Sequence, residues 1–415
     1  MLRSFRAGNH KSLRDEQELL LMPSYQKDQS ALPVTAVFGA NASGKSNVLD
    51  ALAWMCGAVR ESFQSWEPGV RVPREPYRFD EEAIAAPSIF VVEVLVGTVR
   101  YVYGFTVSDD RVLDEWLFTY PKGRKRVIFE REGESWTFGS TVPRARFEAA
   151  RDLTRGNALF LSVAARSDLT EVLPVYHWFA DSVRFESPQA RLQPDVRMVV
   201  SHLRRSSESR RGFLDLVRLA DLGIRDIEVH EGRRVVPNAT SYGSGSGTLV
   251  LPDYELFFRQ GAGTPLLLAD QSHGTVAWLR ILSAALDSLE TGRLLCIDEL
   301  DSSLHPRLTA RLIELFRHPE TNPRGAQLVF TTHDATLLGT SFGDDVLNRD
   351  EIWFTEKDSS GATTLFPLTD FHPRKGGNLE RQYLGGSYGA VPAVFSDTLV
   401  DALLTSGGEG SDEPS

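Results

Sequence analysis

Residues 34–46 of the 415-residue chain limit its fold more than any other stretch. Val34 to Phe38 is apolar apart from Thr35, which is typical of a buried strand. The stretch that follows, GANASGKS at 39–46, matches G-x-x-x-x-G-K-[ST] at every position. Residues 47–60 are rich in Leu, Ala and Val, which predicts a helix. The order strand, glycine-rich loop, helix predicts an α/β fold with a phosphate-binding loop.

This loop is expected to surround a polyphosphate with main-chain donors. Its glycines permit a tight turn that points N–H groups inward, and the start of the next helix adds partial positive charge. Lys45 is expected to reach the β- and γ-phosphates of a bound nucleotide, and the Ser46 hydroxyl to ligate Mg²⁺. The predicted nucleotide-binding residues are Gly39, Ala40, Asn41, Ala42, Ser43, Gly44, Lys45, Ser46 and Asn47.

Two adjacent acids follow a second apolar stretch, Leu294 to Ile297. Ligands of parallel sheets gather at the carboxyl ends of the strands, and adjacent carboxylates are costly to bury without a cation. Asp298 is therefore expected to hold Mg²⁺, and Glu299 to act as the general base on the attacking water. The alternative is a strand end whose acids cap the next helix, and the phosphate loop upstream argues against it.

Two further positions complete the predicted site. His333 ends a third apolar strand, Gln327 to Thr332, where an imidazole can bond the γ-phosphate and respond to its loss. Upstream, Ser272 and Gly274 lie in DQSHGT, at the expected start of an apolar helix, where free N–H groups bind anions. A histidine after a strand and a Ser-x-Gly helix start are each common structural features. The order of the motifs along the chain favours a role for both in binding phosphate.

Between these motifs the predicted secondary structure changes from the α/β pattern to strands and then to helices. Successive runs rich in Val, Phe, Tyr and Trp at 88–138 predict an antiparallel meander. Apolar residues at three- and four-residue spacing predict helices at 147–222, and without sustained heptads no coiled-coil arm is expected. The predicted segments are 1–87 (first part of a head that carries the phosphate loop), 88–140 (β lobe), 141–260 (helical insertion and connection), 261–400 (second part of the head) and 401–415 (disordered tail).

Composition narrows the possible partners. The net charge of −11 argues against a general attraction to nucleic acid or anionic membranes. Arginines at 144–155 and 204–211 could form basic faces for DNA, although solvated helix faces balanced by acids are the preferred interpretation. Cys56 and Cys296 are expected to be buried free thiols. Without a signal peptide or an apolar run that could cross a bilayer, a cytoplasmic location is predicted.

The motif order resembles the ATP-binding-cassette (ABC-type) ATPases, in the branch with the SMC, RecF and OLD-type proteins. GANASGKS, DQSHGTVAWLR, CIDELDSSLHP and LVFTTHD resemble its Walker A loop, signature helix, Walker B strand with D-loop, and switch-histidine strand. The chain resembles more closely still the small bacterial AAA-family ATPases of the abortive-infection and RloA-like group, which are linked with phage defence. That similarity is carried by AGNHKSLRDEQELLL, RLADLGIRDIEV, RDEIWFTEKD and YLGGSYGAVP.

The resemblance implies an ABC-type head that uses ATP and Mg²⁺ and works as a head-to-tail homodimer with two composite sites. Residues that would act within their own subunit are Lys45, Ser46, Asp298, Glu299 and His333. Ser272 and Gly274 would contact ATP held by the partner, and Asp301 would couple the two sites. A lid glutamine is not placed: Gln64 is a candidate, but it follows the loop helix too soon.

The group resemblance suggests an ATP-driven switch in antiphage defence that controls a separately encoded nuclease or toxin. One alternative is a RecF-like repair ATPase that clamps duplex DNA. Another is an OLD-type ATPase–nuclease, although the chain after His333 is short for a nuclease domain and holds no convincing Glu…Asp-x-Asp set. A transporter ATPase is disfavoured because the insertion separates the loop from the signature too widely.

Overall fold

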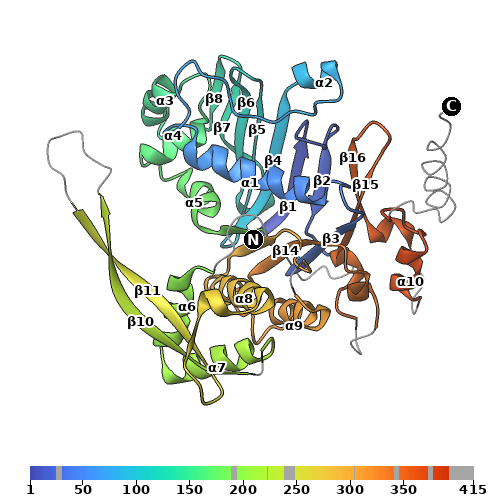
Figure 1. Cartoon of the computed structure of the whole chain (residues 1–415). Helices are drawn as coiled ribbons and strands as arrows, with labels where there is room; N and C mark the ends of the chain where they lie inside the picture. The colour runs from blue at the N-terminus through green and yellow to red at the C-terminus, as the bar shows by residue number, and fades with distance from the viewer. Residues whose placement is uncertain are drawn as a thin grey trace, which may run out of the picture.

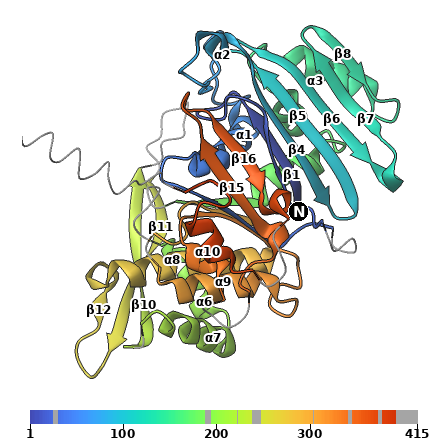
Figure 2. The same cartoon turned by 90° about the vertical axis from the view of Figure 1, so that its right-hand side faces the viewer.

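The computed structural model of the protein describes residues 1–24, 30–187, 194–221, 223–237, 248–302, 304–340, 345–372 and 377–391. Figure 1 and Figure 2 show a layered α/β head beside a lobe built on a large antiparallel sheet. The tail predicted at 401–415 lies outside the described residues. This arrangement confirms the predicted fold class, an α/β head with an antiparallel β lobe and a helical insertion.

A six-stranded sheet carries the predicted motifs, in the order β16-β15-β3-β14-β13-β9. Its strands are β3 (Val34–Gly39), β9 (Val183–Glu186), β13 (Leu294–Ile297), β14 (Gln327–Thr332), β15 (Ile352–Lys357) and β16 (Thr363–Pro367). All neighbouring strands pair in parallel except β16, which is antiparallel to β15. Because β14 lies between β3 and β13, the loops that follow these three strands meet at one edge of the sheet.

Helices cover both faces of this sheet, which explains why β3, β13 and β14 are buried throughout. The covering helices are α1 (Lys45–Glu61), α8 (His273–Thr291) and α9 (Pro306–Arg317). Val37 and Val329 belong to the core that α1 shares with the antiparallel lobe. Ala36 and Phe330 belong to the core with α8 and α9, on the opposite face. The continuous apolar runs in the sequence therefore reflect strands packed on two sides.

The antiparallel lobe is a seven-stranded sheet in the order β2-β1-β4-β5-β6-β7-β8. Its strands are β1 (Leu2–Gly8), β2 (Gln17–Leu20), β4 (Ser88–Val96), β5 (Val99–Val107), β6 (Val112–Tyr120), β7 (Arg126–Glu132) and β8 (Ser135–Phe138). The meander expected at 88–138 is confirmed, and β1 and β2 extend it from the N-terminus. Trp54 of α1 stacks on Phe90 of β4 with ring centroids 4.5 Å apart, so the loop helix and the lobe share one core.

The insertion between lobe and head is mostly helical, as expected. Its elements are α3 (Arg144–Leu153), α4 (Phe160–Arg166), α5 (Leu173–Asp181), α6 (Val196–Arg204), α7 (Ser207–Arg218), β10 (Ile224–Pro237), β11 (Thr248–Gln260) and β12 (Leu266–Leu267). The prediction of helical structure throughout 147–222 was wrong at β9. This short strand interrupts the helices and pairs with β13 at the edge of the head sheet. The described residues contain no coiled-coil arm, and their longest helix, α8, has 19 residues.

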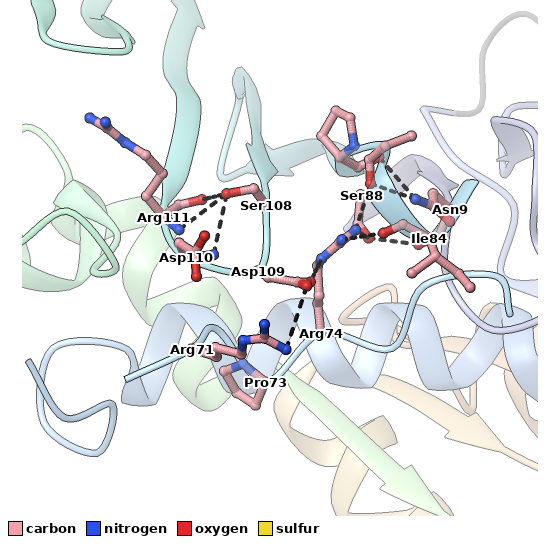
Figure 3. Close-up of polar contacts among 12 residues, drawn as sticks. Asn9, Arg71, Pro73, Arg74, Ile84, Ser88, Ser108, Asp109, Asp110 and Arg111 are labelled. Carbon is pink, nitrogen blue, oxygen red and sulfur yellow. Dashed lines mark hydrogen bonds and ion pairs between the residues drawn. The ribbon is translucent and has the colours of Figure 1, made fainter. Parts of the chain in front are cut away.

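A buried arginine joins the lobe to the segment before α2 (Glu81–Ala85). The Arg74 side chain is only 2% exposed, and its guanidinium donates to Asp109 Oδ1 at 2.5 Å and to the Ala86 carbonyl at 2.6 Å (Figure 3). The Asn9 amide also donates to the Ala86 carbonyl, at 2.8 Å. Ser12, three residues further along, accepts a bond from the side chain of Asn47, in the first turn of α1 after the phosphate loop. These bonds connect the turn between β5 and β6 to the segment after β1 that contains Asn9 and Ser12, next to the phosphate loop.

The arginines that could have formed basic faces are mostly paired. Arg204, Arg205 and Arg210 form ion pairs with Glu231, Glu290 and Asp226, respectively. Arg144 and Arg151 pair with Glu148 and Asp152, and Arg146 and Arg155 donate to main-chain carbonyls.

Cys56 and Cys296 are buried free cysteines, as predicted. Within the part of the chain that is described, no helix has the length and apolar character needed to span a bilayer.

Candidate functional site

The phosphate loop connects the buried strand β3 to α1, as the motif predicts. Gly39 ends β3, where a Cβ atom would lie 2.5 Å from both Ser43 Oγ and Thr355 Oγ1. Gly44 precedes α1 with a φ of +102°, a left-handed conformation that glycine adopts without strain. The motif glycines are therefore required by the close approach of neighbouring segments as well as by the turn.

Lys45 is the first residue of α1 and is buried, with 6% of its surface exposed. Its ammonium donates to the carbonyls of Gly39 at 2.7 Å and Ala40 at 2.9 Å, across the loop it belongs to. Burial lowers the pKa of Lys45, and the carboxylates of 298, 299 and 301 oppose that shift. The lysine thus lies inside the loop, in the field of the acids that follow β13.

The outer side of the loop is held by polar side chains that no motif predicts. Ser43 Oγ and Thr355 Oγ1 lie 2.7 Å apart. Thr363 Oγ1 lies 2.9 Å from the Ser43 carbonyl and 2.7 Å from Ser12 Oγ, which also accepts a bond from the Asn47 amide at 2.6 Å. Ser12, Thr355 and Thr363 come from distant segments, so only the folded chain brings them to the loop.

We expect Gly44→Ala to damage this loop. The new Cβ would lie 2.1 Å from Thr363 Oγ1 and would occupy a left-handed backbone, so the free energy of unfolding should fall by about 2–4 kcal/mol. Gly57→Ala is the matched control, because Gly57 lies within α1, the helix that Gly44 precedes, and its added Cβ meets nothing within 4 Å. Denaturant unfolding of both variants checks this, and equal stabilities would contradict it.

The acids expected at the end of β13 do face the loop. Ser46 Oγ donates to Asp298 Oδ1 at 3.0 Å, and the Thr331 hydroxyl donates to the same oxygen at 2.6 Å. Asp298 is also tied to the other neighbouring strand, because its N–H donates to the Glu186 carbonyl at 2.9 Å. The two residues predicted to ligate Mg²⁺ are therefore in contact with each other.

Glu299 follows with an unusual backbone. Its φ is +50°, a left-handed conformation that is strained for a residue with a side chain. Its N–H donates to Thr331 Oγ1 at 2.7 Å, and its carbonyl accepts from the Ser302 N–H at 3.0 Å. Strain held in place by its surroundings is typical of functional positions, which agrees with the predicted role of Glu299 as the base.

His333, the predicted switch histidine, contacts Asp301 in the turn after β13. His333 Nδ1 lies 3.0 Å from Asp301 Oδ2, and the side chains are 56% and 6% exposed. The other carboxylate oxygen, Asp301 Oδ1, is buried without a partner. A carboxylate on one ring nitrogen orients an imidazole and leaves the second nitrogen for a ligand. Asp301, predicted to couple two sites, thus also positions the histidine within one subunit.

The two residues predicted to form the signature, Ser272 and Gly274, lie at the start of α8. Ser272 caps α8: its Oγ accepts from the Thr275 N–H at 3.1 Å, and its side chain is exposed. In the described chain no hydrogen bond links Ser272 to residues 39–47. Gly274 lies in the first turn of the same helix. Gln64, the candidate lid glutamine, lies beyond the far end of α1, which has 17 residues and so spans about 25 Å. That candidate is not supported.

The donor set suits a small hard cation. Mg²⁺ prefers oxygen ligands and is usually held by one or two protein oxygens together with nucleotide phosphates, a combination that Ser46 and Asp298 offer. Among the described residues, no group of three or more His, Cys, Asp or Glu side chains is placed to hold a metal ion, so the oxygens of a bound nucleotide would have to complete the shell.

Comparison with known structures finds several SMC heads. A head bound to the C-terminal winged-helix domain of ScpA has 14% identity and a TM-score of 0.43, over 89% of this chain and 99% of that one. A Pyrococcus furiosus head with an extended coiled coil, bound to the C-terminal domain of ScpA, has 13% identity and a TM-score of 0.41, over 89% and 97%. A Pyrococcus yayanosii head with a coiled coil and joint has 12% identity and a TM-score of 0.39, over 90% and 99%.

A search of curated proteins finds no match. The family profile described as "AAA domain, putative AbiEii toxin, Type IV TA system" (AAA_21) matches residues 34–339. That span begins at the first residue of β3 and includes the phosphate loop, Ser272, both acids after β13 and His333. It covers more than half of the chain and agrees with the abortive-infection ATPases that the sequence resembles. The chain belongs to this AAA-domain family.

Proposed function

We propose that the protein is an ATP-hydrolysing switch that works as a head-to-tail homodimer with two composite ATP sites. The observation that carries the proposal is the edge of the sheet at which β3, β13 and β14 end. There Ser46 contacts Asp298, while Glu299 and His333 follow the neighbouring strands. The residues predicted to bind phosphate, hold Mg²⁺ and accept a proton therefore follow neighbouring strands at one edge of the sheet, and this supports the proposal.

Within this site each group has a distinct task. The loop N–H groups and Lys45 bind the β- and γ-phosphates of ATP. Ser46 and Asp298 would hold Mg²⁺, which when bound neutralises charge that develops on these phosphates. Glu299 accepts the proton of the attacking water, and the free ring nitrogen of His333 donates to the γ-phosphate. The residue that lacks a task in its own subunit is Ser272.

Ser272 and Gly274 supply the argument for a dimer. The start of α8 exposes N–H groups that suit an anion, yet Ser272 makes no bond to the loop of its own subunit. A second copy placed head-to-tail would bring this helix start to the γ-phosphate and close the site, twice by symmetry. ATP would then hold the subunits together, and hydrolysis would release them.

The output of the switch is proposed from the family. Its description names a putative AbiEii toxin of a type IV toxin–antitoxin system, which fits abortive infection as an antiphage response in the cytoplasm. We place a separately encoded nuclease or toxin under the control of the ATPase. The paired arginines of α3, α6 and α7 give no observation that favours a DNA clamp. Nothing in the described residues favours a nuclease within this chain.

The purified protein is expected to release phosphate from ATP only when Mg²⁺ is supplied, and to dimerise when ATP is bound. Phosphate release with and without EDTA measures the first property. Sedimentation of the protein with ATP, with ADP and without nucleotide measures the second. Hydrolysis by a species that stays monomeric throughout would contradict the composite site, and absence of ATP binding would contradict the proposed function itself.

A further inference from the structure

Thr331 lies between the strand that carries the phosphate loop and the strand that carries the acids. It belongs to β14, near the carboxyl end, and is fully buried. The parallel register of β13 and β14 pairs Ile297 with Phe330, so the next residues along, Asp298 and Thr331, are neighbours. The site motifs singled out His333, just after this strand, and Thr331 has no assigned role.

The hydrogen bonds of Thr331 have a defined direction. Its Oγ1 lies 2.7 Å from the Glu299 main-chain nitrogen and 2.6 Å from Asp298 Oδ1. The amide can only donate, so the threonine oxygen accepts there and its single proton is free for the carboxylate. The Thr331 carbonyl accepts a further bond from the Leu300 N–H at 3.1 Å. One residue therefore holds the whole turn that follows β13.

These bonds act on both predicted functional acids. On Asp298 the hydroxyl makes a short bond to a charged group, which is stronger and more directional than a neutral one. Ser46 contacts the same carboxylate oxygen, so the carboxylate is fixed between β14 and the loop. On Glu299 the bond reaches a main chain in a left-handed conformation, and that main chain determines where the side chain of the base begins.

We propose that Thr331 is a positioning residue, which orients Asp298 for Mg²⁺ and holds the Glu299 main chain for proton transfer. The inference rests on the proposed function, because both tasks belong to ATP hydrolysis. A purely structural role would differ in its consequences: loss of a satisfied buried hydroxyl would lower stability and leave the Mg²⁺ dependence of nucleotide binding unchanged.

Three variants separate these roles. Thr331→Val keeps the shape of the side chain and removes the hydroxyl, and Thr331→Ser keeps the hydroxyl without the methyl group. Thr35→Val is the matched control, because Thr35 is a fully buried threonine on the adjacent strand β3 whose hydroxyl has no partner. ATP affinity is measured by equilibrium titration in Mg²⁺ and in EDTA, and kcat, KM and the thermal midpoint are measured alongside.

In Mg²⁺, Thr331→Val should bind ATP about 10–100-fold more weakly than wild type and lose a similar factor in kcat, as is typical when a residue that orients a metal ligand is removed. In EDTA its affinity should stay within about twofold of wild type, because the loop and Lys45 are unchanged. Thr331→Ser should recover to within about threefold of wild type, and Thr35→Val should behave as wild type throughout.

Thr331→Val with wild-type Mg²⁺ dependence and kcat, and only a lower thermal midpoint, would overturn the proposal. If the valine variant does not fold, Thr331→Ser and Thr331→Ala decide, since they differ by one oxygen: weaker Mg²⁺-dependent binding in the alanine variant supports the assignment, and equal binding overturns it. A wild-type protein that neither binds nor hydrolyses ATP would overturn the proposed function as well, and the two failures are thereby distinguished.

Discussion

Glu299→Gln is expected to lower kcat for ATP hydrolysis by at least about 100-fold and to leave ATP affinity within about threefold of wild type. Glutamine keeps the shape of the side chain and the N–H bond to Thr331, but it cannot accept the proton of the attacking water. Because the hydrolysed state is not reached, ATP should accumulate on the protein and the dimer should persist. Phosphate release, ATP titration and sedimentation measure the three effects.

The control for this variant is Glu314→Gln. Glu314 lies on α9, is 50% exposed and pairs with Arg311 at the surface, so its loss should leave hydrolysis unchanged. If Glu299→Gln turned over ATP as fast as this control, Glu299 would not be the base. If the variant instead failed to bind ATP, the Glu299 side chain would be needed to build the ATP site rather than to accept a proton.

Lys45→Ala should lower ATP affinity by at least about 100-fold. A charge at about 4 Å from an oppositely charged group is worth roughly 4 kcal/mol at an effective dielectric constant of about 20, which exceeds this factor. The loss should be larger than a surface lysine would cause, because the carboxylates of 298, 299 and 301 remain and repel the triphosphate. Titration with a labelled nucleotide measures the affinity without requiring turnover.

Lys125→Ala is the matched control for charge removal. Lys125 lies in the turn before β7, is 50% exposed and has Glu130 as a distant ion-pair partner at 3.8 Å. Its removal changes the net charge by the same amount and should leave ATP affinity unchanged. Comparable affinities of Lys45→Ala and Lys125→Ala would show that the loop lysine does not contact the phosphates.

The parts of the site that were predicted from sequence are those encoded within a few consecutive residues. The phosphate loop combines a strand, glycines and a helix start, and each has a local physical cause that can be read without the fold. The acids after β13 and His333 follow apolar strands, whose burial on two faces leaves a clear signal. The meander at 88–138 was predicted for the same reason, since its turns and β-rich runs are local.

What sequence reasoning missed depends on contacts between distant segments. β9 is a short strand inside a helical region, and its identity comes from pairing with β13. Thr363 reaches the phosphate loop from the hairpin of β15 and β16, in which no motif indicates a partner. The left-handed φ of Glu299 and the pairing of Asp301 with His333 likewise require the turn after β13 to pack against β14.

The central claim, a site shared between two subunits, is tested most directly by mixing two inactive variants. Lys45→Ala disables the loop, and Gly274→Asp places a negative charge where the signature would meet the γ-phosphate of the partner's ATP. In a mixed head-to-tail dimer one site combines both defects and the other has neither. Random assortment should then restore about a quarter of the wild-type hydrolysis rate, while each variant alone is inactive. A mixture no more active than its separate components would contradict the account.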